Sequence, residues 1–254
     1  MVKAHVVAVE RLNTADRLGA AITVIAGEDI GQVAVVDAES GVVVGSEFGW
    51  LTHGVLSDAD DLMAREESRA LVYGDRRLFI DVIPPPPVML IFGAGHIAQP
   101  LTAFAQSAGF RVVVSDARTT WATPERFPTV DELIVGWPDA VFDHIPVDRR
   151  TYVVLLSHDA RFEEPVFAAV HRKPVRYLGA MGSRRTHAAR VARLKEAGWT
   201  AEEVDTIHGP IGLDLKGHSP AETAVAILAE VIQVRYGQGS ARPLHGTDEP
   251  IHLT

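Results

Sequence analysis

Cysteine is absent from this chain of 254 residues. Its absence excludes disulfides, cysteine-ligated zinc, iron–sulfur clusters and thiol catalysis by the chain itself. Long apolar runs are absent too, because none approaches the roughly 20 residues that a membrane helix requires. The N-terminal residues also lack the basic-then-apolar layout of a signal peptide. Together these features predict a cytoplasmic protein that makes no use of a membrane.

Positive charge is scarce, with 24 lysines and arginines against 33 acidic residues. This balance argues against general binding to nucleic acid, whose phosphate backbone is bound by basic surfaces. The charge is also uneven, because residues 1–83 hold 7 basic and 14 acidic residues, whereas residues 161–195 hold 9 basic and 2 acidic ones. We therefore expect a local site for an anion in the second half of the chain.

Four consecutive prolines at residues 84–87 mark a predicted domain boundary. Prolines fix φ, remove N–H donors and favour an extended polyproline strut. We therefore divide the chain into a first domain of residues 1–83, interpreted as a small α+β domain, and a second of residues 84–254. In the first domain we predict strands at residues 21–25, 32–36 and 42–44, and a helix over residues 58–71 capped by Ser57.

After the prolines, apolar strands alternate with glycine or polar turns and amphipathic helices. This alternation is typical of a parallel α/β sheet of the Rossmann-like type. Pro100 falls near the start of the first of these helices, which predicts an irregular first turn or a kink. We predict strands at residues 88–92, 111–115, 132–135, 152–156 and 176–180, and helices at residues 96–108, 163–172, 183–197 and 220–236.

A G-x-G-x-x-A turn at residues 93–98 links the first of these strands to the first helix. Gly93 permits the tight turn, and Gly95 lets a phosphate approach the backbone at the positive end of the helix. Asp116 ends the next strand, where dinucleotide-binding folds place a carboxylate on a ribose hydroxyl. Arg118 follows and could accept a phosphate instead, so this pair leaves NAD and NADP both open. The alternative is a merely structural turn.

A second glycine turn precedes the third predicted helix, with Gly182, Ser183, Arg184 and Arg185 at its start. Basic residues oppose the helix dipole at this end unless an anion is present. A phosphate held by backbone N–H groups and guanidinium groups would satisfy them. The alternative is that both arginines are simply solvated.

Two further segments follow strands at the same expected edge of the sheet. Ser157-His158-Asp159 ends the fourth strand, and ligands collect at the carboxyl ends of strands in open α/β sheets. His158 is expected to contact the ligand, and His158 with Asp159 forms a candidate proton-transfer pair. The loop at residues 208–214 either closes over the site or is a packed crossover. The histidines show no metal-binding spacing, so no metal site is predicted.

Four blocks in this order resemble the XdhC/CoxI family of xanthine dehydrogenase accessory proteins. They are residues 90–96, 157–159, 177–184 and 210–214, and the resemblance covers residues 84–254. It implies a chaperone rather than an enzyme, which binds molybdenum cofactor, as molybdopterin or its dinucleotide form, and delivers it to a molybdenum hydroxylase. A cysteine desulfurase as second partner and a homodimer are implied as well.

The first domain departs from the family, which commonly has a Gly-Gly-Cys segment there, whereas residues 48–53 contain no thiol. This difference argues against thiolate contact with molybdenum and against a sulfur relay through the chain. Two other functions stay open, an NAD(P)-dependent oxidoreductase with His158 as proton donor and a regulator that senses a nucleotide. The candidate cofactor-binding residues are Gly93, Ala94, Gly95, His96, Asp116, Arg118, His158, Gly182, Ser183 and Arg184.

Overall fold

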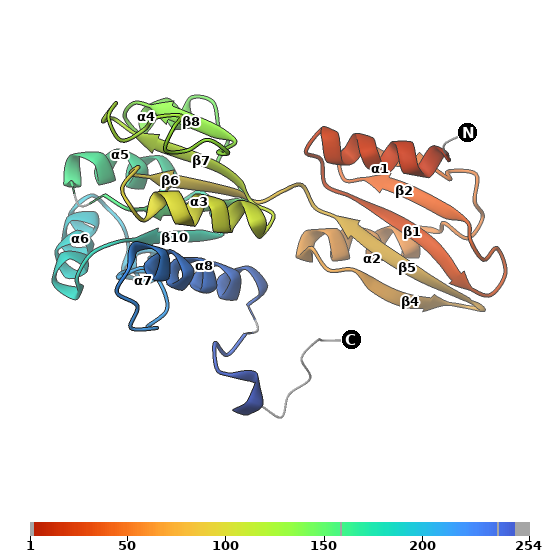
Figure 1. Ribbon diagram of the computed structural model, residues 1–254. Helices are drawn as coiled ribbons and strands as arrows, with labels where there is room; N and C mark the ends of the chain where they lie inside the picture. The colour runs from red at the N-terminus through yellow and green to blue at the C-terminus, as the bar shows by residue number, and fades with distance from the viewer. Residues whose placement is uncertain (1–2, 158, 238, 247–254) are drawn as a thin grey trace. The chain divides into compact units, whose positions relative to one another are not determined.

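The computed structural model describes residues 3–157, 159–237 and 239–246. The chain forms two compact units that divide between Pro86 and Pro87, inside the run of four prolines (Figure 1). Each unit contains its own sheet. Among the described residues, no helix is long and apolar enough to cross a membrane.

The first unit is an antiparallel sheet with two helices. Its strands lie in the order β3-β2-β1-β5-β4. Helix α2 places Val55, Ala59 and Leu62 in the buried cluster with Ile22 of β1. Helix α1 packs through Leu12 against β1. The elements are α1 (Ala4–Thr14), β1 (Gly19–Ala26), β2 (Val33–Asp37), β3 (Gly41–Val44), α2 (His53–Arg65), β4 (Arg69–Tyr73) and β5 (Arg76–Ile83).

The helix predicted over residues 58–71 is wrong at both ends. The actual N-cap is Thr52, whose side chain accepts a hydrogen bond from the Val55 N–H, so Ser57 lies inside α2. The helix ends at Arg65 because Glu66 adopts a left-handed conformation with φ 55°. Residues 69–71 instead form part of β4, which pairs with β5. The prediction also omitted α1, β4 and β5.

The second unit confirms the predicted α/β class. Its five strands are parallel and lie in the order β10-β9-β6-β7-β8. Alternate residues of the central strands enter different cores, with Met89 and Ile91 on one face and Leu90 and Phe92 on the other. The strands are β6 (Val88–Phe92), β7 (Arg111–Asp116), β8 (Glu132–Val135), β9 (Thr151–Leu155) and β10 (Tyr177–Ala180).

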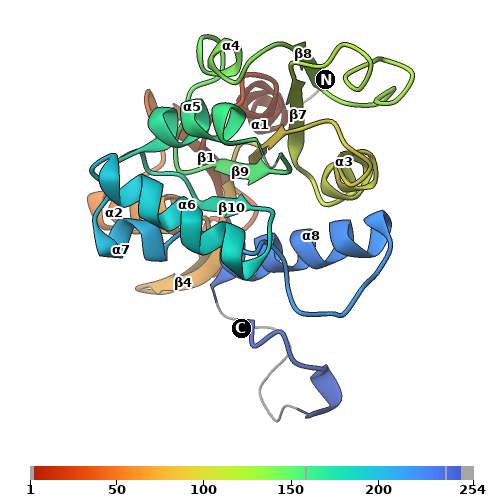
Figure 2. The same ribbon diagram turned by 90° about the vertical axis from the view of Figure 1, so that its left-hand side faces the viewer.

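Helices cover both faces of this sheet, as Figure 2 shows with α3 and α8 on one side and α5 and α6 on the other. Every strand and helix predicted for the second domain is present, with ends within three residues of those expected. The short helices α4 and α7 were not predicted. The helices are α3 (Ala98–Ser107), α4 (Asp139–Phe142), α5 (Ala160–Val170), α6 (Arg184–Glu196), α7 (Ala201–Asp205), α8 (Pro220–Tyr236) and the 3-10 turn η1 (Leu244–Gly246).

Local sequence accounts for the starts of two of these helices. Helix α8 begins with the capping box of Ser219 and Glu222, with Pro220 in its first turn. Helix α3 begins at Ala98, two residues later than predicted, so Pro100 lies in its first turn. Residues in the first turn of a helix need no N–H for the intrahelical ladder, so proline is tolerated at this position. The irregularity expected from Pro100 is confined to the turn before the helix, in which the Ala98 N–H donates to the Gly95 carbonyl at 3.2 Å.

Candidate functional site

The strand order of the second unit reverses at β6, and the candidate site lies where the carboxyl ends of its strands meet. From β6 the chain runs outward to β7 and β8, then returns to the other side of β6 for β9 and β10. Ligands bind at such a reversal in open α/β sheets, outside the carboxyl ends of the strands. Because β9 separates β6 from β10, the turns at Gly93 and Gly182 lie about 10 Å apart, two strand spacings.

The first glycine turn leaves room at its front. Gly93 has φ +113°, and an added Cβ would lie 3.2 Å from the backbone of Leu156 and Ser157, so only glycine fits at the reversal. An added Cβ at Gly95 would meet nothing within 4 Å. The N–H groups of Gly95 and His96 donate to no acceptor among the described residues. The turn therefore offers open donors at the start of α3.

Asp116 supports this turn from the neighbouring strand. Its Oδ2 accepts hydrogen bonds from the Ala94 N–H at 2.7 Å and from Arg118 Nη2 at 2.6 Å. Its Oδ1 accepts from the Arg118 N–H and Nε, both at 2.9 Å. Burial by itself raises the pKa of Asp116, but the bonds from Arg118 and Ala94 outweigh it and leave the pKa below its usual value. Asp116 is therefore charged and fully engaged at neutral pH.

Trp121 and Arg126, which sequence reasoning missed, complete the surroundings of the first turn. The Trp121 ring has the Arg118 and Arg126 guanidinium carbons 5.0 and 4.5 Å from its centre. His96 meets the ring edge-on at 5.1 Å. Arg126 is fixed by donating to the Trp121 carbonyl and to Gln99 Oε1. Two cations and one carboxylate thus lie beside the open donors.

The second glycine turn is more tightly packed. Gly182 has φ +147°, and an added Cβ would lie 3.0 Å from Thr186 Cβ. Ser183 caps α6 by accepting from the Thr186 N–H at 3.1 Å. The N–H groups of Gly182 and Ser183 have no acceptor among the described residues. Arg184 occupies the first position of α6, where it is exposed.

A buried ion pair lies behind this second turn. Arg190 and Glu163 have side chains only 1% and 2% exposed, and Arg190 donates to both Glu163 oxygens at 3.0 and 2.7 Å. Arg190 Nη2 also donates to the Met181 carbonyl at 2.8 Å. The pair therefore fixes the strand end from which the turn starts. The sequence alone gave no signal for this pairing, which joins α5 to α6.

The segment between the two turns contains the predicted proton-transfer pair. His158 lies outside the described residues. Asp159 is the N-cap of α5, where it accepts from the Arg161 N–H at 3.0 Å and pairs with the Arg161 side chain. Its hydrogen bonds with Arg161 lower the pKa of Asp159. The Asp159 carboxylate thus has a structural partner of its own.

The loop at residues 208–214 is packed against β10. His208 pairs with the strand, its carbonyl accepting from the Ala180 N–H at 2.9 Å. Glu230 of α8 accepts from the Tyr177 hydroxyl and from the Gly212 N–H, and its other oxygen lies 3.3 Å from His208 Nδ1. Burial raises the pKa of Glu230, but these hydrogen bonds together lower it below its usual value. Of the two interpretations of this loop, the contacts favour the packed crossover.

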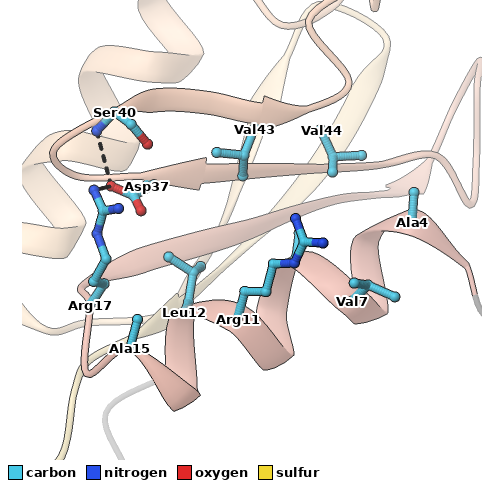
Figure 3. A pocket seen from close by; sticks show the side chains of 11 residues that line it. Ala4, Val7, Arg11, Leu12, Ala15, Arg17, Asp37, Ser40, Val43 and Val44 are labelled. Carbon is cyan, nitrogen blue, oxygen red and sulfur yellow. Dashed lines mark hydrogen bonds and ion pairs between the residues drawn. The ribbon is translucent and has the colours of Figure 1, made fainter.

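Other cavities lie away from the strand ends of the second unit. A pocket of about 470 Å³ in the first unit lies between α1 and β3, and Figure 3 shows Arg11 pointing across it from α1. A pocket of about 370 Å³ between α5 and α6 is lined by Trp199, His171 and Arg193 among others. Within the described residues no group of three or more His, Asp or Glu side chains could hold a metal ion.

Comparison with known proteins identifies a matching family model and several similar proteins. Residues 89–231 match the family model described as the XdhC Rossmann domain. The chain is 30% identical over 158 residues to a Bacillus subtilis (strain 168) protein named as a probable xanthine dehydrogenase subunit, covering 62% of the chain and 46% of that protein. It is 39% identical over 109 residues to the molybdenum cofactor insertion chaperone PaoD of Escherichia coli (strain K12), covering 41% of the chain and 34% of PaoD.

The matched stretches thus span less than half of either relative. A crystal structure described as a xanthine dehydrogenase from Bacillus halodurans has a similar fold, with a TM-score of 0.55 at 18% identity. The alignment covers 95% of this chain and 98% of that one. At this identity the likeness shows the fold alone.

Proposed function

Since the chain belongs to the XdhC family, we propose that it binds molybdenum cofactor as cargo and delivers it to a molybdenum hydroxylase of the xanthine dehydrogenase type. The relative PaoD, named as a molybdenum cofactor insertion chaperone, supports this proposal. The observation that carries it is the open face of the first glycine turn, where the Gly95 and His96 N–H groups have no acceptor among the described residues and a Cβ added to Gly95 would meet nothing within 4 Å. The role is that of an accessory protein without turnover.

Each residue of the site has a part in this proposal. The N–H groups of Gly95 and His96 bind the phosphate end of the cargo at the positive end of α3. Gly182, Ser183 and Arg184 hold the other side of the candidate site, about two strand spacings away. His158, which lies outside the described residues, is kept as a proposed contact of the cargo. Asp159 positions the start of α5 rather than moving a proton.

Sulfuration of the cargo would not route sulfur through this chain, because the chain contains no cysteine. A cysteine desulfurase would therefore act directly on the bound cargo. Release of the cargo requires that the hydroxylase reach the carboxyl ends of the strands. We therefore expect the hydroxylase to bind the protein without covering these strand ends.

Retention of cargo tests the proposal. Molybdenum cofactor released from a donor hydroxylase is mixed anaerobically with the protein, which is then passed through a desalting column and analysed for pterin and molybdenum. We expect the wild type and the control Gly239→Val to retain both, because a Cβ at Gly239 meets nothing within 4 Å. Gly95→Val should lose them, since its side chain occupies the phosphate space.

Delivery is tested separately with a cofactor-free hydroxylase. Loaded wild-type protein should restore its activity faster than the same amount of free cofactor. Failure of the wild type to retain pterin, or retention by Gly95→Val equal to that of the wild type, would contradict the proposal.

A further inference from the structure

The carboxylate of Asp116 has no capacity left for a ligand. A carboxylate accepts about four hydrogen bonds, and Asp116 accepts one from Ala94 and three from Arg118. Its side chain is only 4% exposed. In folds that bind NAD, the acid at this position accepts the ribose hydroxyls. Here a ribose could reach Asp116 only after Arg118 had left it.

Arg118, in contrast, faces outward with donors to spare. Its side chain is 57% exposed, and its Nη1 makes no hydrogen bond with a described residue. The two bonds to Asp116 and the contact with the Trp121 ring hold the guanidinium in one orientation. A guanidinium that is already oriented loses less conformational entropy when it binds an anion.

The charge around Arg118 also favours an anion. Arg118 and Arg126 lie on the Trp121 ring, while Asp116 is the carboxylate bound to Arg118. These three side chains together carry a net positive charge of one. A phosphate monoester near pH 7 carries up to two negative charges and matches both this charge and the open N–H groups.

We propose that Arg118 is a specificity-determining residue that binds a terminal phosphate monoester at the first glycine turn, with Asp116 and Trp121 holding it in place. The inference rests on the proposed function for the location of the cargo. It goes further by naming the cargo form, which is the pterin with a free phosphate rather than a nucleotide recognised through its ribose hydroxyls. Asp116 is then a positioning residue and not a ribose acceptor.

A matched pair of probes tests this assignment. One probe is a fluorescent 6-substituted pterin with a terminal phosphate monoester, and the other is the same pterin after phosphatase treatment. Fluorescence titration gives both dissociation constants for the wild type, for Arg118→Gln and for Arg149→Gln. Arg149 is an exposed arginine just before β9, at the opposite edge of the sheet, so it controls for the loss of one surface charge.

We expect the wild type and Arg149→Gln to bind the phosphorylated pterin about tenfold or more tightly than the dephosphorylated one, as for a charge-assisted hydrogen bond. In Arg118→Gln the preference should fall below about threefold, while the affinity for the dephosphorylated pterin stays unchanged. The Ala94 and Arg118 N–H groups still donate to Asp116 in this variant, but two charge-assisted bonds are lost, so thermal unfolding is measured beside the titration and both probes are compared on folded protein.

The outcomes separate the two proposals. Equal binding of both pterins by the wild type, or a preference that survives in Arg118→Gln, overturns the role of Arg118 and leaves cargo binding standing. Binding of neither pterin by the wild type overturns both. A second pair, NADP against NAD, differs by one phosphate monoester, and tighter binding of NAD would also contradict the assignment.

Discussion

At the first glycine turn an added Cβ on Gly95 would meet open space, whereas at the second turn an added Cβ on Gly182 would lie 3.0 Å from Thr186. The first turn is supported by the hydrogen bond that the Ala94 N–H donates to Asp116 on the neighbouring strand, and it stays open in front. The second is filled by its own helix and supported from behind by the Arg190–Glu163 pair. Two glycine turns at the carboxyl ends of strands thus differ in packing, because the first is open at its front and the second is filled by its own helix.

The largest effect is expected from breaking the support of the second turn. Glu163→Gln leaves Arg190 buried without its counter-charge, and removing one partner of a buried pair costs about 3–5 kcal/mol. Denaturant unfolding of the second unit measures this loss. Arg193→Gln is the control, because Arg193 is 40% exposed and also contacts Glu163, so its loss should cost much less. Equal losses in these two variants would contradict the view that the buried pair supports the second turn.

A pair of glycine substitutions separates folding from binding at the first turn. Gly93→Ala places a Cβ at φ +113° and 3.2 Å from the backbone of Leu156, which should cost about 2–4 kcal/mol of unfolding free energy. Gly95→Val should leave the free energy of unfolding within about 1 kcal/mol of the wild type while it abolishes cargo retention. Thermal unfolding and the retention assay, applied to both variants, compare the loss of stability with the loss of cargo binding. If Gly95→Val were more destabilised than Gly93→Ala, the conclusion that the first turn is open at Gly95 would be wrong.

Acid should weaken the first turn through Asp116. Its pKa is lowered in the fold, so its contribution to stability is present above the ordinary value of 3.8 and is lost as the pH falls through the lower folded value. Asp116→Asn should therefore unfold more easily than the wild type at pH 7, by about 1–2 kcal/mol. The difference should shrink near pH 3, as denaturant titrations at both pH values would show. A constant difference would mean that the charge of Asp116 does not hold the turn.

The smallest effect is expected at the cap of the second turn. Ser183→Ala removes the acceptor for the Thr186 N–H and should cost about 1 kcal/mol, as N-cap serines usually do. Ser219→Ala at the start of α8 should cost a similar amount. Only the Ser183 variant is expected to lower cargo affinity as well, so a loss of affinity in both would argue against a local role.

The sequence predicted the second unit far better than the first, for reasons visible in particular residues. Strand 88–92 and helix α8 carry complete local signals, a continuous apolar run before a glycine turn and a capping box. In the first unit, the helical spacing of Leu62, Arg65 and Arg69 continued past the true end of α2. The left-handed Glu66 and the pairing of β4 with β5 override that spacing, and both depend on tertiary packing.

The candidate site was predictable only in part. The glycines and the N-cap Ser183 follow from spacing, and the structure places them at the carboxyl ends of β6 and β10, with β9 between them. The Arg118 side chain occupies acceptor positions of the Asp116 carboxylate. The spacing of these two residues in the sequence does not predict this side-chain orientation. Two further features could not be predicted from a local sequence pattern. They are the contact of Trp121 with two arginines and the pairing of Arg190 with Glu163, which depend on the folded structure.

Competition between ligands is the sharpest test of molybdenum cofactor binding at the first glycine turn. The purified protein is offered molybdenum cofactor, NAD and NADP together under anaerobic conditions, and native mass spectrometry identifies which ligand stays bound by its mass. We expect the wild type to retain the molybdenum cofactor and Gly95→Val to retain none of the three. Retention of a nicotinamide dinucleotide in place of the cofactor would contradict this expectation and would make the candidate site that of a nucleotide-dependent enzyme or sensor.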